Sequence, residues 1–143
     1  MLTLSMSKKT DQYNQYKTQN VMTASPGELT LMLYDGCLKN MKLGKMYIEE
    51  KAYEKANKAL QKSEAIVMEL ISSLDLSYEI GSQMLNLYVY VNDQIVQANI
   101  KKDGGLLDFP IELISEFREV WQQVVRQSRI QAYGGAAGIP GSG

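Results

Sequence analysis

The chain has 143 residues, of which 45% are hydrophobic and 22% are charged, and its formal net charge is −1. This composition is typical of one globular domain with a real core, and it offers no electrostatic reason to bind nucleic acid or an anionic membrane. No stretch is long and apolar enough to insert into a bilayer, and the first residues lack the pattern of a secretory signal. A single cysteine cannot form an internal disulfide. From these three observations we expect a cytoplasmic protein.

The first 22 residues are polar, with Tyr13 and Tyr16 as their notable apolar groups. Such a segment cannot bury a core of its own, so we expect a flexible arm that is able to form a short helix. A well-marked helix start follows it. Ser25 can cap the helix, Pro26 suits its first position, and Glu28 stands at the capping-box spacing from Ser25.

Apolar periodicity predicts four helices, at about 26–48, 52–74, 82–102 and 110–132. Because their connections are short, we expect an all-α, antiparallel up-down four-helix bundle over residues 23–131. The glycine-rich stretch 132–143 is expected to be a disordered tail.

The first and third helices each carry two apolar stripes, whereas the second and fourth gather their apolar residues in one arc. On the first helix, one stripe is Leu29, Leu33, Cys37, Met41 and Ile48, and Leu31 and Leu38 lie roughly opposite. On the third helix, one seam is Met84, Tyr88, Val91, Ile95 and Ala98, and the other is Leu85, Val89, Val96 and Ile100. The surplus predicts either a surface for a partner or for self-association, or a central pair of helices flanked by the other two.

Catalytic and metal-binding patterns are scarce. The absence of histidine excludes Ser-His-Asp and Cys-His arrangements and the histidine-containing metal sets of helical bundles. Neighbouring carboxylates such as Glu49 and Glu50 fall at a predicted helix end, where solvation explains them. We therefore expect no enzyme, metal or cofactor, with a bundle enzyme or metal carrier as a rival hypothesis.

The run TASPGELTLMLYDGCLK resembles the N-terminal helix of the flagellar secretion chaperones, the FliS family. Further landmarks agree in order with that family. They are the tyrosines before this run, Leu87-Tyr88-Val89-Tyr90, Gln97-Ala98-Asn99-Ile100-Lys101-Lys102-Asp103, and Phe117-Arg118-Glu119-Val120-Trp121. The resemblance covers about residues 13–126.

This resemblance implies a chaperone that holds the disordered C-terminal segment of flagellin, blocks premature polymerisation and keeps flagellin competent for export. It also implies contact with the flagellar export apparatus. The expected client-binding residues are Leu31, Leu33, Tyr34, Leu38, Leu85, Tyr88, Val89, Val96, Asn99 and Ile100. The alternative is a self-associating helical-bundle adaptor with no flagellin client, and weak homo-oligomers are compatible with either reading.

The arm suggests a second hypothesis. Tyr13 and Tyr16 are spaced so that both rings share one side of a helical turn. Tyrosine suits a surface that is buried in one state and wet in another. We expect the arm to cover part of the client surface until a client displaces it.

Overall fold

The computed structural model describes residues 26–136, which form α2 (Pro26–Glu49), α3 (Tyr53–Ser72), α4 (Glu79–Lys101), the short 3-10 helix η2 (Gly104–Leu107) and α5 (Asp108–Ala136). No strand occurs in this part of the chain, which confirms the predicted all-α class. The expectations for residues 1–22, including those for Tyr13 and Tyr16, lie outside the described residues, as do those for residues 137–143.

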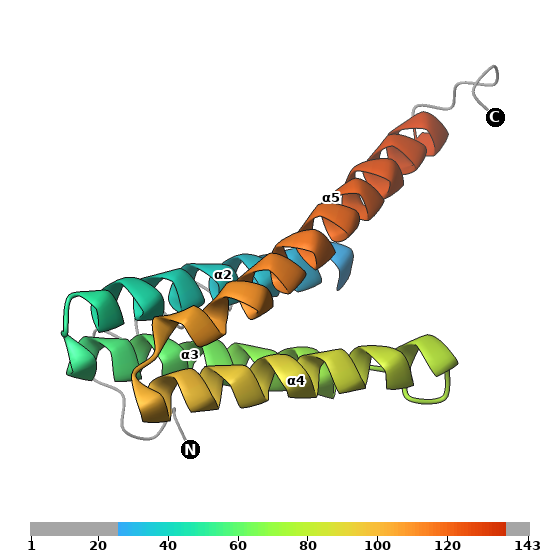
Figure 1. Cartoon of the computed structure of the whole chain (residues 1–143). Helices are drawn as coiled ribbons and strands as arrows, with labels where there is room; N and C mark the ends of the chain where they lie inside the picture. Colours follow the sequence, from blue (N-terminus) through green and yellow to red (C-terminus); the bar gives the residue numbers. More distant parts are fainter. Residues whose placement is uncertain (1–25, 137–143) are drawn as a thin grey trace, which may run out of the picture. The chain divides into compact units, whose positions relative to one another are not determined.

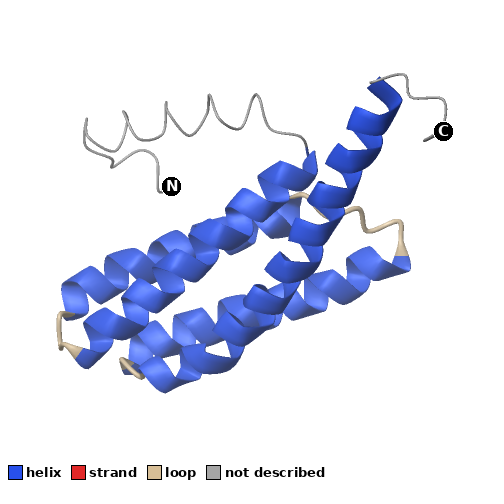
Figure 2. Cartoon of the chain, turned by 90° about the horizontal axis from the view of Figure 1, so that it is seen from above, coloured by secondary structure: helices blue, strands red, loops and turns tan. Residues whose placement is uncertain are grey.

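Successive helices are joined by short connections and run antiparallel, as in an up-down bundle (Figures 1 and 2). Backbone contacts divide the chain into two compact units. The larger unit is Met32–Phe117, and the smaller unit contains residues 26–31 and 118–136 among its described residues.

In the larger unit, α2 and α3 approach closely at two glycines. A Cβ atom on Gly44 would lie 2.3 Å from Leu60 Cδ2, and one on Gly36 would lie 3.1 Å from Ile66 Cδ1. Leu60 is completely buried, so it has little room to withdraw from a larger residue. Glycine therefore permits the close packing of the two helices at Gly44.

A set of local contacts ends α4 and starts α5. Lys102 adopts the left-handed conformation (φ 52°) at the end of α4, and Asp103 caps η2 by accepting a hydrogen bond of 3.0 Å from the Gly105 N–H. The Lys45 ammonium lies 2.6 Å from the Asp108 carboxylate, at the start of α5. These contacts let the chain reverse within a few residues.

The helix ends differ from the predicted ones in a few places. Helix α4 begins three residues earlier than expected, and α5 begins at Asp108 because Pro110 is tolerated in a first helical turn. Helix α5 also continues to Ala136, so part of the expected tail is helical. Glycine costs a helix about 1 kcal/mol relative to Ala, which is not enough to end this helix at Gly134.

The core of the larger unit contains one polar residue that the apolar pattern did not reveal. Ser63 of α3 is completely buried, and its hydroxyl donates a hydrogen bond of 3.4 Å to the Cys37 carbonyl oxygen of α2. Desolvation raises the pKa of the Cys37 thiol to about 12, so the thiol is neutral. Cys37 is thus a small buried core residue, as its position on the first stripe predicts.

Candidate functional site

Helix α4 has two apolar faces with different burial. Tyr88, Val91, Ile95 and Ala98 are buried in the core, as the first predicted seam requires. The second seam stays at the surface, where Leu85 and Val96 are half-buried and Val89 and Ile100 are exposed. We call Leu85, Val89, Val96 and Ile100 the outer seam. It is apolar surface that the described helices leave partly or largely exposed.

A polar bridge fixes where the outer seam lies. The Asn99 side-chain N–H of α4 donates a hydrogen bond of 2.8 Å to the Asn57 side-chain oxygen of α3, and Lys102 donates one of 2.5 Å to the Asn99 oxygen. Because α3 and α4 run antiparallel, this bridge sets their register and holds the outer seam beside α3. Asn99, an expected client contact, is therefore already committed to joining the two helices.

Helix α3 contributes apolar side chains beside the outer seam. Met68 lies eleven residues after Asn57, and Val89 lies ten residues before Asn99. Because the two asparagines are bridged and the helices run antiparallel, Met68 and Val89 lie at about the same height along the helix axes. Met68 and Tyr53 are both exposed. The apolar pattern of this helix falls in one arc that does not include Met68, so the level of Met68 follows from the bridge and not from the pattern.

Four of the ten expected client residues lie in the core: Leu33, Tyr34, Leu38 and Tyr88. The Tyr34 and Tyr88 hydroxyl oxygens are hydrogen-bonded at 2.5 Å, and the Phe117 ring centroid lies 6.1 Å and 6.2 Å from the two tyrosine rings. Burial raises the pKa of Tyr88. In this conformation these side chains stabilise the fold and are not at the surface.

The burial of Leu38, which is only 7% exposed, has a structural cause. Helix α2 has neighbours on several sides: Gly44 meets α3, Tyr34 meets α4, and Lys45 pairs with α5. A helix packed on several sides buries both of its stripes. Within the larger unit, α2 thus fits the central-helix alternative, whereas α4 keeps a free seam.

A further exposed apolar group lies on the other side of α4. The rings of Tyr90 and Phe109 meet edge to face with their centroids 5.9 Å apart, and both side chains are exposed, as is Leu87. The predicted elements do not include this pair, because Phe109 falls before the predicted start of the last helix. The clue was available in the sequence, since Pro110 suits a first turn better than a loop.

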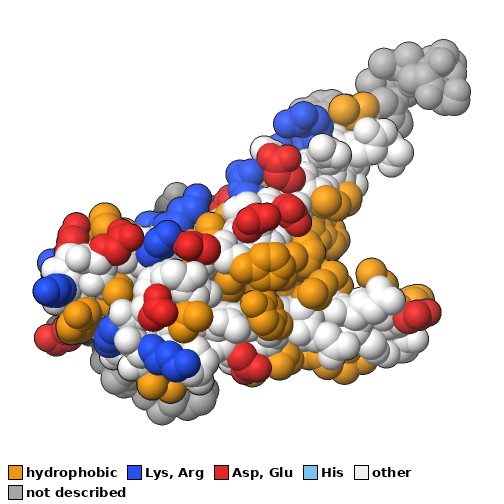
Figure 3. Space-filling view, in the orientation of Figure 1, with side chains coloured by type: hydrophobic (Ala, Val, Ile, Leu, Met, Phe, Trp, Pro, Cys, Tyr) orange, Lys and Arg blue, Asp and Glu red, His pale blue; other side chains and the backbone are white. Residues whose placement is uncertain are grey.

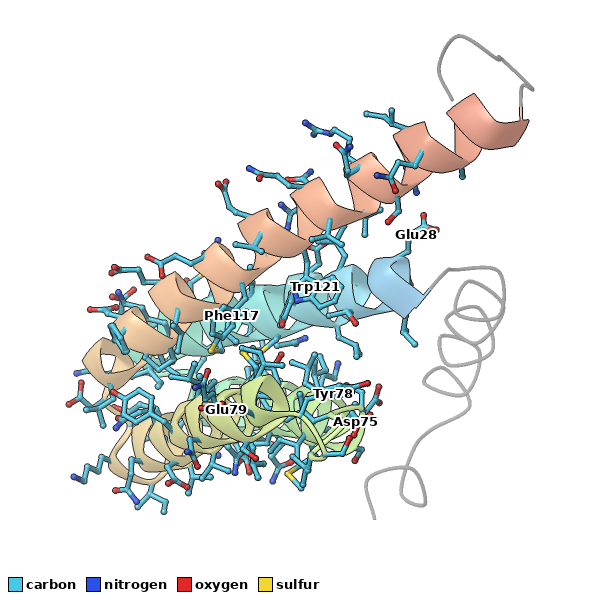
Figure 4. The ribbon with its side chains drawn as sticks, turned by 90° about the vertical axis from the view of Figure 1, so that its right-hand side faces the viewer. Glu28, Asp75, Tyr78, Glu79, Phe117 and Trp121 are labelled. Atoms are coloured by element: carbon cyan, nitrogen blue, oxygen red, sulfur yellow. The ribbon has the colours of Figure 1, made fainter. Side chains whose placement is uncertain are left out.

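In the smaller unit, the start of α2 packs on α5. A Cβ atom on Gly27 would lie 3.2 Å from Val125 and 3.9 Å from Trp121, and Arg129 forms an ion pair with Glu28 (Figure 4). Leu31, the remaining expected client residue on α2, is half-buried. Val120 and Val124 are exposed, so part of the single apolar arc that the wheel predicts for α5 is not buried.

Among residues 26–136, no group of three or more His, Cys, Asp or Glu side chains could hold a metal ion. None of the described helices is both long and apolar enough to cross a membrane.

Comparisons with known proteins agree with one another. The sequence model of the family described as "Flagellar protein FliS" matches residues 9–128. The "Flagellar secretion chaperone FliS" of Bacillus subtilis (strain 168) is 39% identical over 122 residues, which covers 85% of this chain and 92% of that protein. The protein of the same name from Vibrio cholerae is 31% identical over 103 residues, covering 71% of this chain and 76% of the relative.

The fold has a solved counterpart. A structure described as "Crystal structure of flagellar chaperone from bacteria" superposes with a TM-score of 0.67 and covers 83% of this chain and 98% of that one. Its sequence identity is 16%, so this likeness bears on the fold alone.

Proposed function

Because this chain belongs to the FliS family of flagellar proteins, whose matched relatives are named flagellar secretion chaperones, we propose that it binds the disordered C-terminal segment of flagellin in the cytoplasm. Covering that segment prevents premature polymerisation and keeps flagellin competent for export. The loaded chaperone is then received by the flagellar export apparatus. This is a binding function without a catalytic step.

The observation that carries the proposal is the outer seam of α4. Its members, spaced by four, seven and four residues, line one side of the helix and remain at the surface of the folded chain. A segment that is disordered alone gains stability by folding as an amphipathic helix on such a surface. Met68, beside the seam, adds a flexible side chain that adapts to the client.

The direct test measures binding of the full chain to a fluorescently labelled peptide with the C-terminal sequence of flagellin. We expect a one-to-one complex by light scattering and a gain of helical circular dichroism when the peptide binds. A peptide of the same composition in scrambled order is the control. A chain that binds both peptides equally, or neither, would contradict the proposal.

The alternative, a self-associating adaptor with no client, predicts a different result. In a concentration series without peptide, its mass by light scattering rises through use of the same apolar seam. The peptide would not shift that equilibrium. For a client chaperone, adding the peptide converts any self-associated species into the one-to-one complex.

We also propose that the arm around Tyr13 and Tyr16 competes with the client for the outer seam. A competitor that contributes about 1–3 kcal/mol lowers the apparent affinity for client by about fivefold to 150-fold. Deleting residues 1–20 should therefore tighten peptide binding and increase self-association. Hydrogen exchange at Tyr13 and Tyr16 that is equally fast with and without peptide would exclude this competition.

A further inference from the structure

The connection between α3 and α4, together with the first turn of α4, presents apolar side chains to water. Leu76, Tyr78 and Ile80 are each more than half exposed, and we call these three residues the loop cluster. Connections between helices are ordinarily polar because they run over the surface. Three large apolar side chains at a chain reversal mark a surface that is covered in some other state of the protein.

The backbone that carries the loop cluster has a fixed shape. Asp75 Oδ1 accepts hydrogen bonds from the Ser77 N–H (3.0 Å) and the Ser77 hydroxyl (2.6 Å), and the Tyr78 N–H donates to the Asp75 carbonyl oxygen (3.3 Å). The chain then closes on Gly81, where a Cβ atom would lie 2.1 Å from the Asp75 carbonyl oxygen. A partner therefore meets a preformed surface, which lowers the entropy cost of binding.

The charge around the loop cluster has one sign. The sequence contains no Lys or Arg between Lys62 and Lys101, whereas Asp75 and Glu79 stand beside the cluster. Figure 4 looks onto this end of the larger unit and labels Asp75, Tyr78 and Glu79. In Figure 3 the same end, at the right of the view, shows orange and red surface and no blue.

We propose that the loop cluster is a docking site for a second protein partner, distinct from the client, whose surface offers an apolar pocket edged by lysine or arginine side chains. The apolar residues supply the contact area, and Asp75 and Glu79 select a basic rim and repel acidic surfaces, anionic membranes included. The cluster lies at the end of the larger unit where the chain reverses, whereas the outer seam runs along its side.

The test measures docking separately from client binding. Its secretion measurement rests on the proposed function, because secreted flagellin reports on this chain only if the chain is a flagellin chaperone. The variants are Leu76→Ser/Tyr78→Ser, which removes apolar anchors, and Glu79→Lys, which reverses the charge. Met46→Ser is the matched control, because Met46 is an exposed apolar residue of α2 that lies near the α2–α3 connection, away from the loop cluster. Each variant is measured for thermal stability, for affinity to the flagellin peptide, and for flagellin secreted by cells in which it replaces the native chaperone.

We expect both loop variants to bind peptide with unchanged affinity and to melt at the same temperature as the native chain. Secreted flagellin should fall by about tenfold, the effect typical of losing an anchor residue of an interface. Met46→Ser should secrete normally. Normal secretion by both loop variants would overturn the proposal, and so would a loss of peptide affinity, which would make the loop part of the client site.

A photo-crosslinker decides the identity of the occupant independently of secretion. With p-benzoylphenylalanine in place of Tyr78, we expect one main adduct in cells, to a lysine- or arginine-rich surface of a protein other than flagellin. Glu79→Lys should abolish it. An adduct to flagellin or to a second copy of the chain overturns the proposal, as does binding to vesicles of phosphatidylcholine and phosphatidylglycerol. If the native chain does not bind the peptide, the proposed function fails while this crosslink still tests the loop.

Discussion

The sharpest prediction compares the same substitution at two isoleucines of α4. Ile100 belongs to the outer seam and is 70% exposed, whereas Ile95 faces the core and is 0% exposed. Burying an isoleucine completely is worth about 1.5–3 kcal/mol, so a client that covers the exposed part of Ile100 gains about 1–2 kcal/mol. Ile100→Asp removes this gain and requires a carboxylate to lose water, so the Kd should rise at least about tenfold.

The two variants should also differ in stability, with little change for Ile100→Asp and a large loss for Ile95→Asp. Ile100→Asp leaves the charge in water, so its unfolding transition should stay close to that of the native chain. Ile95→Asp buries an unpaired carboxylate at a cost of about 5 kcal/mol or more, comparable to the whole stability of a small domain. Urea denaturation followed by circular dichroism measures the transitions, and anisotropy of the labelled peptide measures the affinity.

Two results would refute this reasoning. Unchanged peptide affinity in Ile100→Asp would show that the outer seam is not the client surface. Unfolding of Ile100→Asp as complete as that of Ile95→Asp would show that Ile100 is part of the core. Leu38→Asp is a useful third variant, because the burial of Leu38 now predicts strong destabilisation where the wheel alone predicted a free surface.

Three further predictions concern the core. Tyr34→Phe removes the hydroxyl partner of Tyr88 and should lower the free energy of unfolding by about 1–3 kcal/mol. In a double-mutant cycle measured by urea denaturation, the Tyr34→Phe/Tyr88→Phe chain should lose less stability than the sum of the two single losses. Gly44→Ala forces a methyl group against the buried Leu60 and should cost about 1–3 kcal/mol by the same assay, whereas an unchanged transition would show that α2 and α3 can separate locally. The Cys37 thiol should resist iodoacetamide until the chain unfolds. Because the pKa of this thiol is raised from 9.0 to about 12 in the folded chain, the free energy of unfolding should fall as the pH rises from 9 toward 12. Cys37→Ala should make this fall with pH less steep.

The apolar periodicity was sufficient to predict the four helices and the two seams of α4. A helical repeat separates Ile95 from Ile100 whatever surrounds the helix, so the sequence alone distinguishes the two faces. The periodicity does not show how many other helices pack against a given helix. Leu31 and Leu38 made a second stripe on α2 just as Val89 and Ile100 did on α4, yet Leu38 is buried because α2 is packed on several sides.

Other parts of the candidate surface depend on long-range pairing that no local pattern encodes. The bridge between Asn57 and Asn99 joins residues from different helices, and without it the level of Met68 beside Val89 cannot be assigned. The loop cluster was overlooked for a different reason. Leu76 and Tyr78 lie in a connection and Ile80 lies in the first turn of α4, so no helical repeat links the three residues in the sequence.

The stretch without Lys or Arg between Lys62 and Lys101 also decides how this protein can be studied in complexes. Trypsin cannot cut within it even in the unfolded chain, so one long peptide carries both the loop cluster and the outer seam. Amine-reactive reagents have no target there either, and a footprint based on lysine labelling would report both surfaces as silent whether or not a partner is bound. Cleavage at glutamate, which can occur at Glu64, Glu69 and Glu79, releases a short peptide of residues 70–79 that carries Leu76 and Tyr78 apart from the outer seam and makes their protection by a partner visible.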